Sequence, residues 1–431
     1  MPAKFVVKIK AGFSRHFERS EKSPNYPREA TRCRSSASDS LNSVKTMYSG
    51  GLMKVCWCLN RCCNQTMVAL VALAFTLGGC SELSPDQSNL RYQSRATTEQ
   101  QDQPSKKTSE EHRPSVGAYR ADRISGDYGG YARLEQFVDQ MVRQHGFDRA
   151  YLQGLFSQAK RKDWTLDYYR KSDQAIKSKA APGSWTRYRA QFMEERRIAT
   201  GVEFARRYRS TLQRASRQYG VPEEYILGIM AVETNFGGNM GNHRIIDALT
   251  TLCFDYVRRG DFFRDEMENF LLMTRSEGMD PSRPKGSFAG AMGYGQFMPS
   301  SFRKWAVDFN GDGHRDLWNP EDAIGSIANY FAQHGWQPGR PVVLPLTAAG
   351  PVSLEAGFDT RYTLDSLRQA GLRPSAALND NGQFSLLQLR HQQSDQYLLG
   401  YPNFYTITRY NHSTHYAMAV HELAQAIKGR I

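Results

Sequence analysis

Hydrophobic residues recur at three- and four-residue spacing along most of the chain after residue 130. This spacing places apolar side chains on one face of an α-helix. It predicts helices around 134–142 and from 152 onward, and further helices at 200–219, 222–236, 261–277, 320–334 and 415–428. Strand patterns do not alternate with these helices, so a parallel sheet is not expected. The chain is therefore predicted to be mainly α-helical.

The pattern changes between residues 341 and 409. Short segments at 342–346, 384–389 and 404–408 alternate or are rich in β-formers, and a turn sequence lies at 379–382. Alternation bounded by such turns is typical of strands. We therefore expect a small β-containing subdomain within a mainly α fold.

Near the N-terminus, an eleven-residue, largely apolar run, Met67–Leu77, follows Lys54 and Arg61 and leads to Gly78-Gly-Cys80-Ser81. This order is typical of a signal peptide and is similar to a bacterial lipobox. It predicts a mature N-terminus lipidated at Cys80, and Ser81 favours the periplasmic face of the outer membrane. A short uncut anchor is the alternative, but the run is shorter than the roughly 20 residues that span a bilayer.

The segments around this signal are also distinct. Residues 1–52 are polar and non-periodic, and we interpret them as a gene-model extension before Met53 or as disordered. Residues 53–79 form the predicted signal peptide. Residues 80–130 contain almost no aliphatic side chains, so we expect a flexible tether.

Cysteine positions agree with this organisation. Six of the seven cysteines lie at or before Cys80, which leaves only Cys253 in the predicted mature body. The body therefore has no material for an internal disulfide or a cysteine-based metal site. The cysteines at 56–63 lack zinc-site spacing and fall in the segment expected to be removed.

The net charge of +13 could suggest nucleic-acid binding. However, residues 1–79 hold 12 Lys and Arg against 4 Asp and Glu, so +8 lies there and +5 remains for residues 80–431. Such a mild excess suits an anionic polymer without requiring one. We expect no nucleic-acid partner.

Glu233 is the first candidate catalytic residue. It follows Ile229 by four residues on the apolar stripe of the helix that starts at Pro222, and no Lys or Arg lies between Arg217 and Arg244. Burial away from a cation raises the pKa of a carboxyl group, so one interpretation is a general acid. The alternative is a structural acid that caps a neighbouring element.

The segment 287–301 is rich in glycine and places Gln296 among apolar residues. Glycines permit close approach of a ligand to the backbone, and the amide suits a sugar hydroxyl or acetamido group. No Lys follows, so this is not a phosphate-binding loop. Tight helix packing through small residues is the alternative.

Four ordered motifs resemble one family. They are Glu233-Thr234, Gly290–Ser300 (GAMGYGQFMPS), Ala328–Phe331 (ANYF) and Tyr405–Tyr416 (YTITRYNHSTHY). Together they are similar to the membrane-bound lytic murein transglycosylase B family, from about residue 130 to the end. The resemblance implies a lysozyme-like α-helical core that cleaves the glycan of peptidoglycan without water.

The resemblance also implies residue roles. Glu233 would be the sole acid/base, and the substrate's N-acetyl group would replace a second carboxylate before a 1,6-anhydro ring closes. No acid lies between Lys285 and Val307, which agrees with a one-acid mechanism. The implied substrate-binding residues are Tyr188, Arg258, Arg259, Ser287, Gln296, Phe297, Tyr330, Tyr410, Asn411 and Tyr416.

A candidate calcium loop starts at Asp308. Its acids and amide follow the EF-hand pattern at positions 1, 3 and 5, with glycine at position 6, but position 12 is Asn319. The resembling family has a longer loop, which places the last acid at residue 322. The predicted ligands are Asp308, Asn310, Asp312, His314 and Asp322. Alternatively, residues 319–322 only cap the next helix.

The resemblance divides the body into regions and suggests its partners. The first two regions are an N-terminal helical domain (131–205) and a catalytic core (206–340), which contains the calcium loop (308–322). The β-containing subdomain (341–409) and a C-terminal helix with the Tyr/Asn motif (410–431) follow. The expected partners are peptidoglycan strands and, through Cys80, a membrane. No cofactor is expected for the chemistry. A hydrolytic muramidase and a non-catalytic peptidoglycan-binding lipoprotein remain alternatives.

Overall fold

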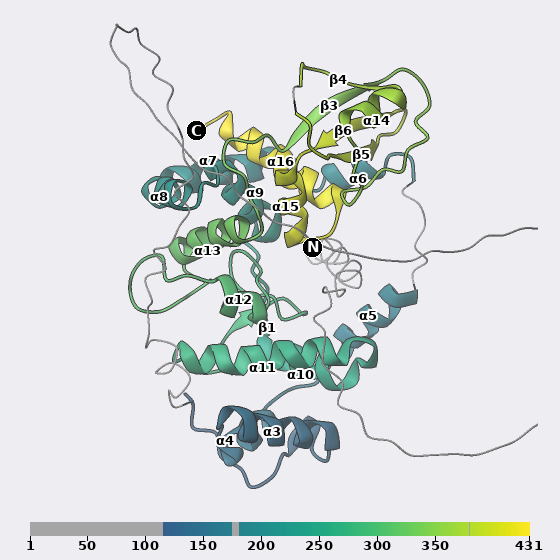
Figure 1. Ribbon diagram of the computed structural model, residues 1–431. Helices are drawn as coiled ribbons and strands as arrows, with labels where there is room; N and C mark the ends of the chain where they lie inside the picture. Colours follow the sequence, from purple (N-terminus) through teal and green to yellow (C-terminus); the bar gives the residue numbers. More distant parts are fainter. Residues whose placement is uncertain (1–114, 175–180, 379) are drawn as a thin grey trace, which may run out of the picture. The chain divides into compact units, whose positions relative to one another are not determined.

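The computed structural model describes residues 115–174, 181–378 and 380–431 (Figure 1). The predicted extension, the signal peptide and Cys80 lie outside these residues. Among the described helices, none combines the length and apolar character needed to cross a membrane.

The first described elements are a short 3-10 turn and two helices. These are η2 (Gly126–Tyr128), α3 (Ala132–His145) and α4 (Arg149–Ser157). Tyr119 and Tyr128 are both buried, and the Tyr119 hydroxyl donates to the Ser282 hydroxyl at 2.7 Å. The packed body thus begins before residue 130, so the predicted end of the tether at 130 is wrong. Tyr119 and Tyr128 pack the otherwise polar segment before residue 130 against the body.

Helices form most of the remaining structure. In chain order they are α5 (Asp163–Gln174), α6 (Ser184–Arg189), α7 (Glu195–Arg207), α8 (Arg209–Tyr219), α9 (Glu223–Thr234), α10 (Ile245–Asp255), η3 (Val257–Arg259), α11 (Gly260–Ser276), α12 (Pro299–Trp305), α13 (Pro320–Gln333), α14 (Leu364–Gln369), α15 (Pro402–Tyr410) and α16 (Thr414–Lys428). The predicted mainly α-helical fold is confirmed. The helices expected at 222–236, 261–277, 320–334 and 415–428 all form, each with its ends within two residues of the prediction.

The single helix predicted over 200–219 is wrong. The chain breaks at Tyr208, whose backbone angles (φ −107°, ψ 26°) lie outside the helical region and separate α7 from α8. Both helices pack against α9, so apolar positions recur at helical spacing on each side of the break. The spacing of apolar residues therefore does not reveal that the helix axis changes direction between α7 and α8.

The β-containing subdomain has one four-stranded sheet. Its strands are β3 (Val343–Ala348), β4 (Leu372–Pro374), β5 (Ser385–Arg390) and β6 (Asp395–Gly400). They pair antiparallel in the order β4-β3-β6-β5. The strands predicted near 342–346 and 384–389 are confirmed, and a buried cluster that includes Leu346, Leu367 and Leu399 joins the sheet to α14.

The strand predicted at 404–408 is wrong, because these residues form α15. Pro402 occupies the first turn of this helix, where a proline is favourable. The hydroxyl of Thr406 donates to the Pro402 carbonyl one turn back, and that of Thr408 donates to the Tyr405 carbonyl. Burial of α15 and these local bonds outweigh the weak β preference of threonine.

A second, very short sheet lies beside the helical core. β1 (His243–Arg244) pairs antiparallel with β2 (Lys285–Gly286), so that His243 faces Gly286. The strands join the segment after α9 to the glycine-rich segment. Both segments lead toward Glu233 and Gln296.

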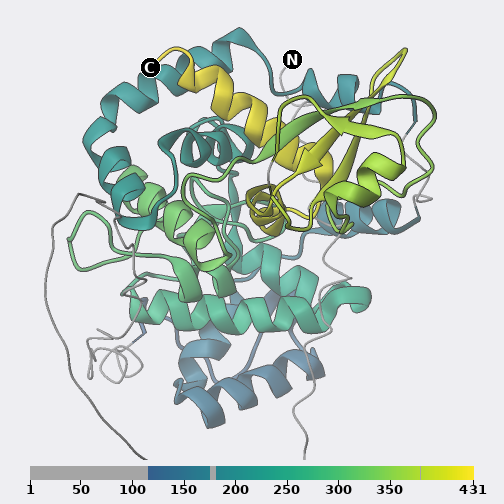
Figure 2. The same ribbon diagram turned by 45° about the horizontal axis from the view of Figure 1, so that its top comes forward.

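The close contact of α9 with α16 holds the core together (Figures 1 and 2). The inward face of α9 is apolar and fully buried around Ile226, Ile229 and Met230. Gly228 permits the approach, because a Cβ there would lie 2.7 Å from the Val420 carbonyl oxygen of α16. The helices can therefore meet backbone to backbone.

We expect Gly228→Val to destabilise the fold by about 1–3 kcal/mol, because an added side chain would push α16 away from α9. Gly350→Val is the matched control, since a Cβ at Gly350 meets nothing within 4 Å. Urea unfolding of both variants measures the difference. Equal midpoints for the two variants would contradict this account of the helix contact.

Candidate active site

Glu233 lies in the last turn of α9, where the backbone turns sharply. Asn235 and Phe236 both adopt left-handed conformations, with φ of 50° and 56°, which non-glycine residues rarely adopt. The amide of Asn235 donates to the Ala231 carbonyl, and that of Phe236 donates to the Met230 carbonyl. These bonds close the helix and hold the segment that carries Glu233.

Thr234 fastens this turn to the glycine-rich segment. Its hydroxyl donates to the Tyr294 carbonyl at 3.0 Å and accepts from the Gly237 amide at 3.1 Å. A Cβ on Gly237 would lie 2.5 Å from the Tyr294 ring, so glycine is required for the contact. The end of α9 is thereby fixed against the segment that carries Gln296.

Tyr416 contacts Glu233 directly from the first turn of α16. Its hydroxyl donates to the Glu233 Oε1 atom at 2.6 Å. The Ser413 hydroxyl caps α16 by accepting from the Tyr416 amide, which fixes the ring at the start of the helix. Glu233 itself is half-buried.

Three tyrosines surround the Glu233 carboxylate. Burial, and then the negative charge of Glu233, raise the pKa of Tyr188, Tyr410 and Tyr416 above the ordinary tyrosine value. Their hydroxyl groups thus stay protonated and can donate. The charge of Glu233 contributes to all three shifts, which places its carboxylate near the three tyrosines.

Tyr410 connects Glu233 to an aromatic cluster. Its hydroxyl donates to the Gly295 carbonyl at 2.9 Å, and its ring lies 4.7 Å from the Tyr330 ring and 5.9 Å from the Phe297 ring. The Tyr330 hydroxyl donates to the Arg409 carbonyl at 2.7 Å. The structure thus brings together the predicted residues at 297, 330 and 410. Asn411 follows them, buried, at the end of α15.

Gln296 is held in a strained and buried position. Its φ is +51° and its side chain is 3% exposed. The side-chain amide donates to the carbonyls of Met240 and Gly293, while its Oε1 atom accepts no hydrogen bond from the described residues. An unsatisfied buried acceptor is costly and points to a role.

The other predicted residues of this region have structural contacts. The Ser287 hydroxyl accepts from the amides of Ala289 and Ala291 and so shapes the turn. Arg258 lies on η3 and pairs with Asp173 at 3.2 Å. Arg259 covers the Phe262 ring at 4.4 Å. Both of these contacts are with residues other than the tyrosines around Glu233.

The candidate calcium loop folds around its own side chains. The Asp308 carboxylate accepts from the amides of Gly311 and Gly313, and the Asp312 carboxylate accepts from the His314 amide. Asn310 donates to Asp312 through its side-chain amide. Within the described ranges, no group of three or more His, Cys, Asp and Glu side chains is placed to hold a metal ion.

Asp322 ties this loop to α13. It is fully buried, and its two carboxylate oxygens accept from the amides of Phe309, Asn310 and Asp316. Burial raises its pKa, and these amides oppose the shift. The side-chain cap of α13 comes from Asn319, which accepts from the Glu321 amide. Asp322 therefore fastens the loop whether or not an ion is bound.

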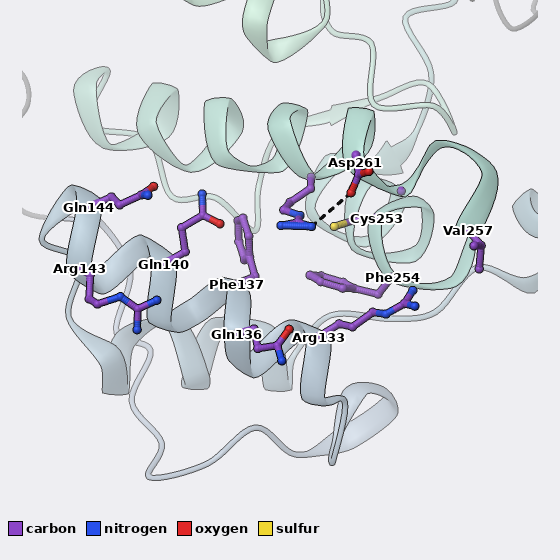
Figure 3. A pocket seen from close by; sticks show the side chains of 12 residues that line it. Arg133, Gln136, Phe137, Gln140, Arg143, Gln144, Cys253, Phe254, Val257 and Asp261 are labelled. Carbon is purple, nitrogen blue, oxygen red and sulfur yellow. Dashed lines mark hydrogen bonds and ion pairs between the residues drawn. The ribbon is translucent and has the colours of Figure 1, made fainter. Parts of the chain in front are cut away.

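A pocket of about 530 Å³ lies elsewhere, between α3 and the segment formed by α10, η3 and α11 (Figure 3). Arg133 and Arg143 of α3 line it, and Arg264 pairs there with Asp261 at 3.2 Å. None of the predicted site residues lines this pocket. It is an open, polar hollow of the surface and is separate from the Glu233 site.

Sequence reasoning assigned no role to Thr234, Asn235 or Tyr294. Thr234 and Tyr294 form the bond that fixes the end of α9, and the Asn235 Oδ1 atom is buried without a hydrogen-bond partner among the described residues. One signal was available: Thr234 and Asn235 directly follow Glu233 and precede two glycines. A polar pair at such a turn is a candidate support for a catalytic acid.

Comparison with known proteins agrees with this geometry. Residues 130–425 match the family described as "Transglycosylase SLT domain". Membrane-bound lytic murein transglycosylase B of Escherichia coli K12 is 51% identical over 308 residues, which cover 71% of this chain and 85% of that protein.

Solved structures are similar as well. The Escherichia coli lytic transglycosylase SLT35 in complex with calcium has a TM-score of 0.67 at 51% identity, with coverage of 71% of this chain and 96% of that one. SltB3 of Pseudomonas aeruginosa in complex with NAG-anhNAM-pentapeptide has a TM-score of 0.60 at 29% identity, with coverage of 69% and 80%.

The helical core and its tyrosine-bound Glu233 define a lysozyme-like lytic transglycosylase. The match covers more than half of the chain. The chain belongs to the transglycosylase SLT-domain family.

We expect Tyr416→Phe to reduce kcat about 10- to 100-fold, because a hydrogen bond to a charged group contributes roughly 1.5–3 kcal/mol. Clearing of a murein suspension, the substrate in the name of the Escherichia coli relative, measures this loss. Tyr225→Phe is the matched control, since its hydroxyl bonds His421 of α16 and Tyr225 lies eight residues before Glu233 on α9. Equal losses in both variants would argue against a specific role of the Tyr416 hydroxyl.

Proposed function

We propose that this enzyme cleaves the β-1,4 bond between N-acetylmuramic acid and N-acetylglucosamine in peptidoglycan and leaves 1,6-anhydro ends. The observation that carries the proposal is the hydrogen bond from Tyr416 to the Glu233 carboxylate, whose charge also raises the pKa of Tyr188 and Tyr410. Hydrolysis by paired carboxylates requires a second acid at a defined separation.

Glu233 acts twice in this mechanism. As an acid it gives its proton to the glycosidic oxygen as the C1–O4 bond breaks, and the acetamido carbonyl oxygen of the muramic residue bonds to C1. As a base it then takes the proton of the C6 hydroxyl, whose oxygen displaces the acetamido oxygen at C1. The anhydro ring closes and Glu233 regains its proton, so no water is consumed.

Tyr416 supports both stages. Its hydroxyl donates to Glu233 at 2.6 Å, which stabilises the carboxylate after the first proton transfer. The same hydrogen bond holds the Glu233 side chain in place for the second stage.

The neighbouring residues suit an acetamido sugar. The unpartnered Gln296 Oε1 atom is a natural acceptor for an acetamido N–H group, and Asn411 adds a second amide. The half-buried Tyr188 ring can pack on a sugar face. The rings of Phe297, Tyr330 and Tyr410 are buried against one another and support the wall of the site. We assign Ser287 to the shape of the same wall, and Arg258 and Arg259 to the lactyl or peptide carboxylates, which arginines bind well.

Product analysis separates this proposal from its alternatives. A hydrolytic muramidase would give reducing ends that are one water heavier than anhydro ends. A non-catalytic binding lipoprotein would bind murein and release nothing soluble. SltB3, which is similar to this chain, forms a complex with NAG-anhNAM-pentapeptide, which supports the anhydro product.

Calcium is our proposal for the loop 308–322. Oxygen-bearing side chains at 308, 310 and 312 suit this ion, and the glycines at 311 and 313 have φ of 83° and 89°. The similar SLT35 structure contains calcium. His314 would add its backbone carbonyl and Asp322 a carboxylate. The ion would stabilise the loop and take no part in the chemistry.

We also propose attachment to the outer membrane through a lipid on Cys80, with the body facing the periplasm. The name of the Escherichia coli relative includes "membrane-bound", and the lipobox-like sequence precedes the body. The partner there is peptidoglycan.

We expect Glu233→Gln to release anhydro-muropeptides from murein at least about 100-fold more slowly, because a positioned acid/base typically contributes 10²–10⁴ in rate. Mass spectrometry of the soluble products measures the loss and identifies the ends. Glu203→Gln, at an exposed position of α7, is the matched control and should keep full activity. Normal release by Glu233→Gln would overturn the mechanism.

We expect calcium to raise the melting temperature of the purified body, since an ion at about 100 times its Kd adds roughly 2.7 kcal/mol. Asp308→Ala should abolish this increase. Asp365→Ala, which changes an exposed side chain of α14, should keep it. Thermal unfolding with calcium and with chelator gives the difference within each variant. An undiminished increase in Asp308→Ala would refute the proposed site.

A further inference from the structure

Trp164, at the start of α5, has an unusual environment. It is 51% exposed and is the only aromatic residue among the large hydrophobic side chains exposed in the described part of the chain. Single exposed apolar side chains are common on protein surfaces, so the significance of Trp164 depends on the rings that surround it.

Neighbouring rings hold Trp164 in place. The Tyr168 ring, one helical turn away, lies at 5.7 Å and is inclined by 25°. The His243 ring of β1 lies at 6.3 Å and is inclined by 12°. The three rings therefore share nearly one orientation, although they come from two separate elements.

Phe288 contacts all three of these rings. It is buried, and its ring meets those of Trp164, Tyr168 and His243 edge-on, with interplanar angles of 88°, 69° and 77°. We call the set of Trp164, Tyr168, His243 and Phe288 the aromatic shelf. The contacts among these rings hold the side chains in place before a ligand binds, so little conformational entropy is lost when a ligand packs on them.

The aromatic shelf is continuous with the Glu233 site through the backbone. Phe288 directly follows Ser287, and His243 is paired with Gly286 in the short sheet of β1 and β2. The segment from Glu233 to His243 contains Met240, whose carbonyl accepts from the Gln296 side chain. The two segments that form the wall around Gln296 therefore also carry His243 and Phe288, two of the four shelf residues.

Flat, parallel rings suit the apolar face of a pyranose better than they suit a charged or extended partner. A glycan strand that enters the Glu233 site has further sugar residues on both sides of the bond that breaks. Aromatic contacts of this kind contribute about threefold to tenfold in affinity.

We propose that the aromatic shelf is a distal subsite, in which Trp164 stacks on an N-acetylhexosamine ring of the same strand, remote from the bond that Glu233 breaks. The proposal rests on the proposed function, since it assumes a glycan strand in the Glu233 site. It assigns to the shelf the selection of long strands over short fragments.

The test measures binding without cleavage. In a Glu233→Gln chain, calorimetry with long and short N-acetylglucosamine oligomers gives affinity as a function of length. We expect added Trp164→Ala to weaken the long oligomers about tenfold and to leave the short ones unchanged. Trp164→Phe should restore most of the loss. Val116→Ala, which trims another exposed apolar side chain, should change neither.

Two results would overturn the subsite. One is equal affinity of Trp164→Ala and its parent for long oligomers. The other is loss of binding for free stem peptide with no change for oligosaccharides. Failure of the proposed function is a separate result, because it would appear as the absence of anhydro products from the unmodified enzyme whatever the oligomers bind.

Discussion

The hydrogen bond from Tyr416 to Glu233 depends on the packing of α9 against α16, and the rest of the site depends on both. The two residues are 183 positions apart, so more than half of the described body lies between them in sequence and must fold before they meet. Gly228 lets the helices approach, and the apolar face of α9 supplies the buried area that offsets the loss of chain entropy. Glu233, the catalytic acid that we propose, is therefore positioned by the core itself.

The Tyr416 contact fits the acid/base role that we propose for Glu233. The Tyr416 hydroxyl donates to the carboxylate and stabilises its charged form. Tyr188 and Tyr410 keep their protons because burial and Glu233 raise their pKa, so the surroundings stay neutral through the cycle.

Local patterns predicted the helices well but could not predict the site on their own. The stripe on α9 identified Glu233, yet Tyr416 and Tyr410 were assigned only through the family resemblance, since nothing local indicates a partner so distant in sequence. The segment 404–408 looked like a strand because Thr406 and Thr408 favour β structure, and only burial and hydroxyl bonds in α15 reverse that preference. The left-handed Gln296 is likewise set by tertiary contacts, which periodicity does not contain.

Gly241, which precedes β1, and Gly286 of β2 bring the segment that carries His243 into contact with the glycine-rich segment that carries Gln296. A Cβ on Gly241 would lie 2.1 Å from the Gly286 carbonyl oxygen, so the two segments touch through their backbones. Met240, one residue before this contact, accepts from Gln296. The contact therefore joins the segment that carries His243 to the backbone that holds Gln296, so a strand at the proposed subsite would lie against the same two segments as the wall of the Glu233 site.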